Sequence, residues 1–118
     1  MNYDRKIVKD AIDVYLSGKV KPKRGVFFSK DNRNRNTCCC AVSAAALAKE
    51  PTLNRNHFSW TKAGEILNRS QNFISAMVDG FDKWDNCYLA GDTDRIKGYA
   101  TGVKIRERLE KLKVRFVE

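Results

Sequence analysis

The segment Cys38–Lys49 (CCCAVSAAALAK) constrains the fold more than any other part of this chain, because it is small and apolar almost all the way round. A helix on a protein surface shows an apolar stripe, whereas a helix enclosed on all sides lacks a polar face. The segment therefore predicts a central core helix that other elements must surround. Thr37 or a preceding Asn is placed to cap its start, and Glu50–Pro51 ends it.

Segments on both sides of this helix predict the elements that surround it. Apolar residues recur at helical spacing in four further stretches, the first of which has a natural end at Gly18. These helices are expected over residues 4–17, 61–68, 71–79 and 93–113. A strand is expected over Gly25–Ser29, paired with the alternating tail Val114–Val117, and a packed loop is expected after Gly80.

Together these elements predict an α+β fold that is mainly α, with about five helices and a minor β element. The 118 residues fit a single domain spanning residues 1–118, long enough to bury a core without disulfides or a metal. In the last helix Gly98 and Gly102 lie four residues apart, which permits close approach of another element.

The net charge of +9 is unevenly distributed along the chain. Residues 1–36 carry +6, residues 95–118 carry +5, and the stretch 80–94 between them carries −3. Such a distribution attracts a polyanion or an acidic protein surface, with a strength that falls as salt rises. The alternative is that surplus Lys and Arg only keep a small protein soluble.

The hydropathy pattern predicts no membrane segment. The longest apolar-leaning run, Cys38–Ala48, is interrupted by Ser43 and is shorter than the roughly 20 residues needed to span a bilayer. The first ten residues are charged where a signal peptide would be apolar. A cytoplasmic location is therefore expected.

The stretch Gly64–Gly80 (GEILNRSQNFISAMVDG) has the pattern of a turn followed by a helix. Its Ser70–Ser75 run, with Leu67 and Gly64 before it, resembles the recognition-helix region of phage-repressor-like helix-turn-helix proteins. The resemblance implies DNA binding through residues 61–80, although Asn68 and Arg69 stand where that family has a glycine and an apolar residue.

The chemistry of the exposed side chains gives this hypothesis its site residues. Gln and Asn can bond adenine edges, and Ser can bond a phosphate, so Gln71, Asn72 and Ser75 are expected to contact duplex DNA. Cations elsewhere in the chain would hold the phosphate backbone. These are Lys21, Lys23, Arg24, Arg33 and Arg35.

A second, looser resemblance covers more of the chain. The Cys39–Cys40 pair at a helix start, the later Gly80–Asp82 and the Tyr88-x-x-Gly91 pattern are similar to short uncharacterised proteins of bacteria and phages. This resemblance implies phage or mobile-element character and no reaction. The alternatives to DNA binding are therefore an accessory or inhibitor protein that binds a host protein, or a structural domain with an ordinary helical hairpin.

The sequence gives little support for catalysis, and a non-enzyme without cofactor or metal is expected. His57 is the one histidine and has no acid at helical spacing. The four cysteines, Cys38, Cys39, Cys40 and Cys87, match neither a disulfide framework nor a zinc-ligand spacing. A thiolate nucleophile among Cys38–Cys40 is the alternative to the expected role, which is packing as buried, reduced thiols.

Overall fold

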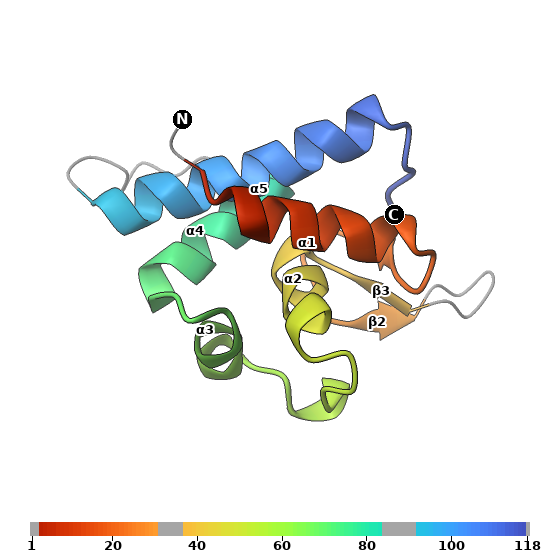
Figure 1. The fold of residues 1–118 in the computed structure, drawn as a ribbon, viewed down its shortest axis with the longest axis horizontal. Coiled ribbons are helices and arrows are strands. Elements are labelled where there is room, and N and C mark those ends of the chain that lie inside the picture. Colours follow the sequence, from red (N-terminus) through yellow and green to blue (C-terminus); the bar gives the residue numbers. More distant parts are fainter. Residues whose placement is uncertain (1–2, 31–36, 84–91, 118) are drawn as a thin grey trace.

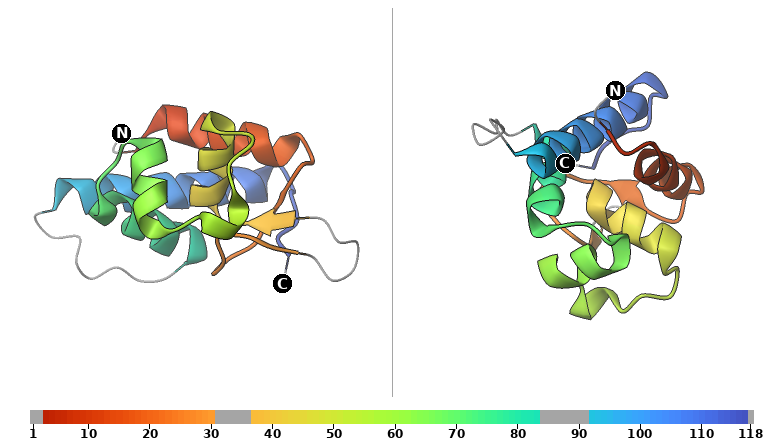
Figure 2. Two further views of the ribbon diagram at one scale, coloured as in Figure 1. Left: turned by 90° about the horizontal axis from the view of Figure 1, so that it is seen from below. Right: turned by 60° about the vertical axis from the view of Figure 1, so that its left-hand side comes forward.

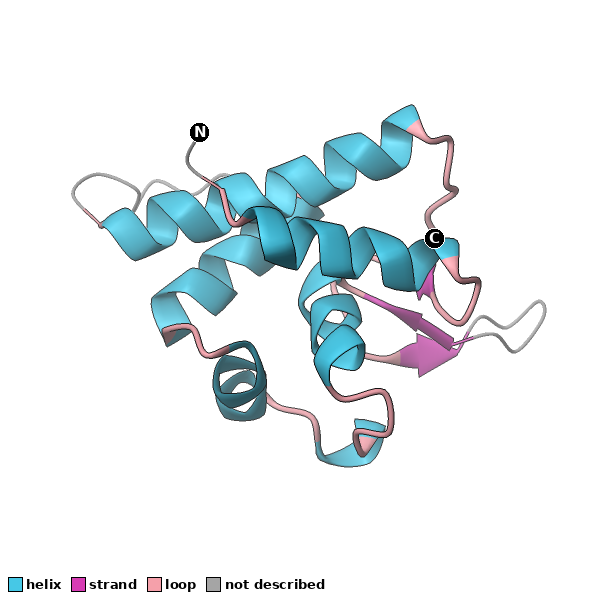
Figure 3. Cartoon of the chain, viewed as in Figure 1, coloured by secondary structure: helices cyan, strands magenta, loops and turns pink. Residues whose placement is uncertain are grey.

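The computed structural model describes residues 3–30, 37–83 and 92–117, which form five α-helices and a small sheet (Figure 1). In chain order the elements are α1 (Arg5–Leu16), β1 (Lys21–Pro22), β2 (Ser29–Lys30), β3 (Thr37–Cys39), α2 (Ala41–Lys49), the 3₁₀ turn η1 (Arg55–His57), α3 (Trp60–Leu67), α4 (Gln71–Asp82) and α5 (Thr93–Lys111). Helices dominate and the strands lie together at one side (Figure 3). The expected mainly-α α+β fold is confirmed.

Helix α2 lies at the centre, as its sequence predicts. Every residue from Ala41 to Leu47 is buried, because α1, α3 and α4 all pack against it. The expected start of this helix is wrong, however. Cys38 and Cys39 lie on strand β3, and Cys40 is the residue before the first turn, with no side-chain cap bond. Small thiols fit a fully buried strand as well as a helix, so composition alone did not separate the two.

The sheet is mixed and has the order β1-β3-β2. Strand β3 pairs parallel with β1, with Lys21 opposite Cys38, and antiparallel with β2, with Ser29 opposite Cys38. The expected strand at Gly25–Ser29 is thus displaced to Ser29–Lys30. The C-terminal tail pairs elsewhere too, since Val117 bridges to Lys23 and its amide donates to the Pro22 carbonyl oxygen at 2.8 Å.

Helix α1 closes the core over α2 and the sheet. Asp4 caps its start by accepting the Ile7 amide proton at 3.1 Å, and Gly18, with φ +81°, ends its C-terminal turn. The Tyr15 hydroxyl donates to the Cys39 carbonyl oxygen at 2.8 Å, which joins the helix to the central strand. In the part of the chain that the structure describes, no helix is long and apolar enough to cross a membrane.

Helices α4 and α5 run parallel and pack backbone to backbone (Figure 2). A Cβ atom at Gly98 would overlap the Phe73 carbonyl oxygen, and one at Gly102 would overlap the Met77 carbonyl oxygen. Gly80 approaches Tyr99 of α5 in the same way. The close approach predicted for Gly98 and Gly102 is confirmed. The packed loop expected after Gly80 begins later, because α4 continues to Asp82 and ends at Lys83, with φ 66°. Residues 84–91 of that expected loop lie outside the described residues.

The tight contact predicts that Gly102→Ala destabilises the fold. Alanine favours a helix over glycine by about 1 kcal/mol, so without the contact the change would stabilise α5. Because the methyl group would force α4 and α5 apart, we expect a net loss of about 1 to 3 kcal/mol in the free energy of unfolding measured in urea. Glu107→Ala, at an exposed α5 position, is the control and should be nearly neutral. A Gly102→Ala variant as stable as the parent would contradict the close packing.

Candidate nucleic-acid interface

Helices α3 and α4 form the helical hairpin at which DNA reading was expected. The link is Asn68–Ser70, and Asn68 adopts the left-handed conformation, with φ 53°, that Asn tolerates. Ser70 caps α4 by accepting the Phe73 amide proton at 3.2 Å. Gly64 is buried against the Gln71 side chain, so a side chain at this position would meet α4.

Arg69 ties this turn to the rest of the protein. Its Nη1 donates to the Asn68 carbonyl oxygen at 2.9 Å, and its Nη2 forms an ion pair with the buried carboxylate of Asp4. Burial of Asp4 opposes its ionisation, but the hydrogen bonds from Arg69 and the Ile7 amide outweigh burial and lower the pKa of Asp4. Arg69 therefore holds the turn through charge, where the resembled family uses an apolar contact.

Two of the three expected base-contacting residues, Gln71 and Asn72, make structural hydrogen bonds. Gln71 and Asn72 are both exposed at the start of α4 and Ser75 is half-buried one turn on. Gln71 Nε2 donates to the Trp60 carbonyl oxygen at 2.9 Å. Asn72 Nδ2 donates to Asp92 Oδ2 at 3.1 Å and its Oδ1 accepts from Arg95 Nη2 at 3.0 Å. The exposed polar atoms of Gln71 and Asn72 thus join α4 to α3 and α5.

Carboxylates occupy the N-terminal ends of both α4 and α5. Asp92 caps α5 by accepting the Arg95 amide proton at 3.0 Å, and the Ser70 hydroxyl donates to Asp94 Oδ2 at 2.6 Å. Because the two helices run parallel, the positive ends of their dipoles lie side by side and stabilise these acids. The charge that a phosphate would seek at the start of α4 is therefore already neutralised.

The expected phosphate-binding residues lie far from this end of α4. The Gly25 amide, next to Arg24, donates to both carboxylate oxygens of Asp82 at 3.1 Å, and Asp82 is separated from Gln71 by about 16 Å of helix. The Arg24 guanidinium lies 4.6 Å from the centre of the Phe116 ring. Lys21 and Lys23 lie on and beside β1. Arg33 and Arg35 are outside the described residues.

Asp82 shows how closely Arg24 is tied to the fold. Half-burial raises the pKa of Asp82 above its ordinary value, against the opposing effects of the Gly25 amide and the Arg24 charge. Arg24 lies beside the C-terminal end of α4, and Lys21 and Lys23 lie on and beside β1. The structure therefore does not bring these cations together with Gln71, Asn72 and Ser75 on one surface.

A basic stripe that the sequence analysis did not identify runs along α5. We use this name for Lys97, Lys104, Arg108 and Lys111, which share one face of the helix. Lys104 lies 5.3 Å above the Tyr3 ring, and Arg108 Nη2 approaches the Tyr3 hydroxyl at 3.5 Å. The last three residues of the stripe line a shallow hollow of about 400 Å³ with Glu107 and Leu112. The spacing of these four cations in the sequence, i, i+7, i+11 and i+14, is the local signal that predicts the stripe.

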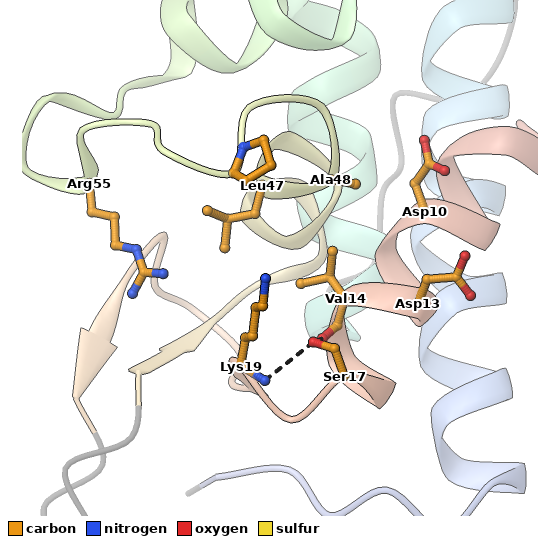
Figure 4. Close-up of a pocket in the computed structure, with 9 residues that line it drawn as sticks. Asp10, Asp13, Val14, Ser17, Lys19, Leu47, Ala48 and Arg55 are labelled. Carbon is orange, nitrogen blue, oxygen red and sulfur yellow. Dashed lines mark hydrogen bonds between the residues drawn. The ribbon is translucent and has the colours of Figure 1, made fainter.

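A second hollow, of about 340 Å³, lies between the C-terminal half of α1 and the end of α2 (Figure 4). Its walls hold Asp10 and Asp13 on one side, with Lys19 and Arg55 opposite. Asp10 pairs with Lys6 at 3.4 Å and Asp13 pairs with Lys9 at 2.8 Å, while Arg55 donates to Thr37. Its two acids are thus paired with lysines of α1, while Arg55 bonds a neutral hydroxyl, so the hollow has walls of both signs and does not favour a ligand of either.

The three described cysteines match the packing role expected of them. Cys38, Cys39 and Cys40 are fully buried, while Cys87 lies outside the described residues. Burial raises the pKa of the Cys39 thiol well above its usual range and also raises the pKa of Cys40. These two thiols are therefore protonated and poorly nucleophilic at neutral pH.

The remaining candidates for catalysis or metal binding are dispersed. His57 is exposed on η1, where its Nδ1 lies 3.0 Å from the Asn54 side-chain amide. Within residues 3–30, 37–83 and 92–117, no three His, Cys, Asp or Glu side chains are placed to share a metal ion.

Comparison of this chain with protein-family models, with curated proteins and with solved structures found no match. The resemblance to helix-turn-helix proteins therefore stays a hypothesis about residues 61–80. Any functional proposal depends on the geometry and charge of this chain alone.

The Asp4–Arg69 pair predicts a pH-dependent contribution to stability. Because the pKa of Asp4 is lower in the folded than in the unfolded protein, the carboxylate stabilises the fold above the ordinary Asp pKa of about 3.9. This contribution is lost as the pH falls through the folded-state pKa. We expect the free energy of unfolding of Asp4→Asn to fall less steeply than that of the parent between pH 4 and about pH 2. Parallel stability profiles for the two proteins would contradict the assignment.

The buried thiols predict slow chemical modification. In a Cys87→Ser background, we expect a thiol reagent to label Cys38–Cys40 far more slowly in the native protein than in denaturant, because reaction must wait for opening of the core. The labelled sites can be counted by mass spectrometry. Rapid labelling of the folded protein would show that a thiol is reactive and would reopen the nucleophile hypothesis.

Proposed function

We propose that the protein is a cytoplasmic, non-enzymatic protein that binds duplex DNA mainly through its phosphate backbone. The observation that supports this proposal best is the basic stripe of α5. Its four cations lie on one helix face between Lys97 and Lys111, over about 21 Å. Duplex DNA carries about one phosphate charge for every 1.7 Å of its axis, so a stretch of this length offers about a dozen phosphates.

The charges around the stripe favour a polyanion. Glu107 is a nearby carboxylate on the same side of α5, and Asp4, which is paired with Arg69, interacts with the charge of Lys97. Glu110 points elsewhere and lies 3.5 Å from Arg106. Lys113 and Arg115 follow the helix and are both exposed. A row of cations with few balancing acids concentrates counter-ions, and their release on DNA binding supplies affinity.

In this proposal the start of α4 supports the fold and contributes little to sequence readout. A base-contacting role for Gln71 and Asn72 would require them to leave hydrogen bonds to Trp60, Asp92 and Arg95. It would also bring Asp92 and Asp94 towards the phosphates. Binding through the stripe instead predicts strong salt dependence and weak sequence preference.

Removing the stripe charges is the direct test. We expect Lys104→Gln/Arg108→Gln/Lys111→Gln to weaken binding to all duplexes alike, measured by anisotropy of a labelled 20-base-pair DNA over a salt series. The slope of log affinity against log salt should become shallower by about 0.9 for each lost phosphate contact. The pair Lys97→Gln/Lys111→Gln, which spares the contacts with Tyr3, provides a second variant in case the triple variant is unstable.

The matched control removes the same charge from other surfaces. Lys19, Lys49 and Lys83 are exposed on the loop after α1, the end of α2 and the end of α4, and their joint replacement by Gln should change affinity much less. Equal losses of duplex affinity in the two triple variants would show that only the net charge matters and would contradict binding through the stripe. Loss of sequence preference in Gln71→Ala, with affinity for random DNA retained, would instead restore the base-contacting role of α4.

A further inference from the structure

Four aromatic side chains from two distant segments meet on the side of the molecule away from α5. Phe27 packs edge-on against Phe58 at 5.1 Å and against Trp60 at 4.9 Å between ring centres, and Phe28 packs against Phe58 at 5.4 Å. Phe27, Phe28 and Phe58 are partly buried against the core, but Trp60 remains 45% exposed. The cluster therefore presents an indole ring at the surface, supported from beneath by other rings.

The backbone around the indole ring is fixed. Trp60 is the first residue of α3, and Ser59 caps this helix by accepting the Lys62 amide proton at 3.1 Å. The Trp60 carbonyl oxygen accepts a hydrogen bond from the Gln71 side chain of α4. The preceding turn η1 is closed by Asn54, which accepts the Asn56 amide proton at 3.1 Å. An aromatic side chain held in this way loses little conformational entropy when a flat ligand stacks on it.

The segments that supply the rings carry cations and no carboxylate. Residues 19–30 and 51–64 contain neither Asp nor Glu. Their cations are Lys19, Lys21, Lys23, Arg24, Lys30, Arg55 and Lys62. Arg55 lies 5.4 Å from the Phe28 ring centre, directly beside the cluster, while Lys62 is 4.0 Å from the exposed Glu65. Other cations of these segments lie elsewhere, since Arg24 packs on Phe116 and Lys19 lines the hollow beside α1. One exposed indole ring with the Arg55 charge beside the cluster suits an anionic ligand that has flat rings of its own.

We propose that the surface around Trp60 binds single-stranded nucleic acid, with an unpaired base stacked on the indole ring and Arg55 near the phosphates. Base stacking on aromatic side chains tolerates any sequence, because every base has an aromatic face. The stacked bases of an intact duplex do not offer that face, which distinguishes this surface from the basic stripe. The exposed polar groups of Asn54, Asn56 and His57 at its edge argue against an apolar protein partner, since burying them would cost free energy.

This inference is independent of the proposed duplex binding. The α3 end of the molecule and α5 lie on opposite sides of α4 in Figure 1. One surface can therefore fail a test while the other passes it. A protein with both would hold a duplex on one side and a neighbouring unpaired strand on the other.

The test uses the fluorescence of Trp60 in a Trp84→Phe background, which leaves one tryptophan of the two. Titration with a 15-nucleotide oligothymidylate at low salt should quench the emission. Anisotropy of the same labelled oligonucleotide should show Trp60→Ala to bind about 5- to 150-fold more weakly, which corresponds to the loss of one stacked base. Trp60→Phe should keep most of the affinity, because phenylalanine also stacks. Arg55→Gln should lower the salt dependence while leaving the ring in place.

Two comparisons make the result specific. Leu112→Ala removes a similarly exposed apolar side chain just after α5 and should not change oligothymidylate binding. The Lys104/Arg108/Lys111 variant should lose duplex affinity but keep the effect of Trp60→Ala on the single strand.

Three outcomes would overturn the proposal. They are absence of quenching, equal affinities of Trp60→Ala and the parent for the single strand, and equal losses of affinity in Trp60→Ala on duplex and single strand. Urea unfolding of each variant shows whether the fold is intact, and if Trp60→Ala is unstable, Trp60→Phe and Arg55→Gln decide the question.

Discussion

The backbone contact between α4 and α5 is the constraint on which the rest of this structure depends. Parallel helices can approach this closely only where neither carries a side chain at the crossing, and Gly80, Gly98 and Gly102 provide that. The approach buries Phe73 and Phe81 completely and places the two helix N-termini side by side. Two positive helix ends in one place favour carboxylates, so Asp92 and Asp94 become part of the fold. Because these carboxylates occupy the start of α4, this end of the helix is a poor site for a phosphate.

The turn before α4 depends on a second constraint, the buried carboxylate of Asp4. It caps α1 and pairs with Arg69, and the Asp4 amide donates to the Thr101 hydroxyl of α5 at 2.9 Å. One residue thus joins α1, the hairpin turn and α5. Desolvating a charge is costly, and the cost is offset here because several donors converge on the carboxylate. An apolar residue at position 69 would leave Asp4 without this ion pair, so the fold of this chain depends on an arginine there.

The sequence predicted the helices well because their signals are local. Periodic apolar residues, caps such as Asp4 and Ser70, and the glycine pair of the last helix can all be identified within a few residues of the chain. The strands are two or three residues long, and their positions depend on pairing between distant segments, so Cys38 and Cys39 were assigned to a helix. Likewise, Gln71 and Asn72 have the side chains of base readers, but the partners that occupy Asn72 lie 20 and 23 residues away. No local pattern shows such a bond.

The distribution of charge explains how a small basic protein acquires two separate cationic surfaces. Several of its described carboxylates have structural tasks: Asp4 and Asp92 cap helices, Asp82 accepts the Gly25 amide, and Asp10 and Asp13 pair with lysines of α1. On the stripe face of α5 the nearby carboxylates are Glu107 and, beside Lys97, Asp4, which Arg69 already pairs. The cations of the stripe therefore outnumber the acids beside them, and such an excess attracts anions. At the Trp60 surface, Arg55 donates to the Thr37 hydroxyl, a bond that leaves its positive charge in place.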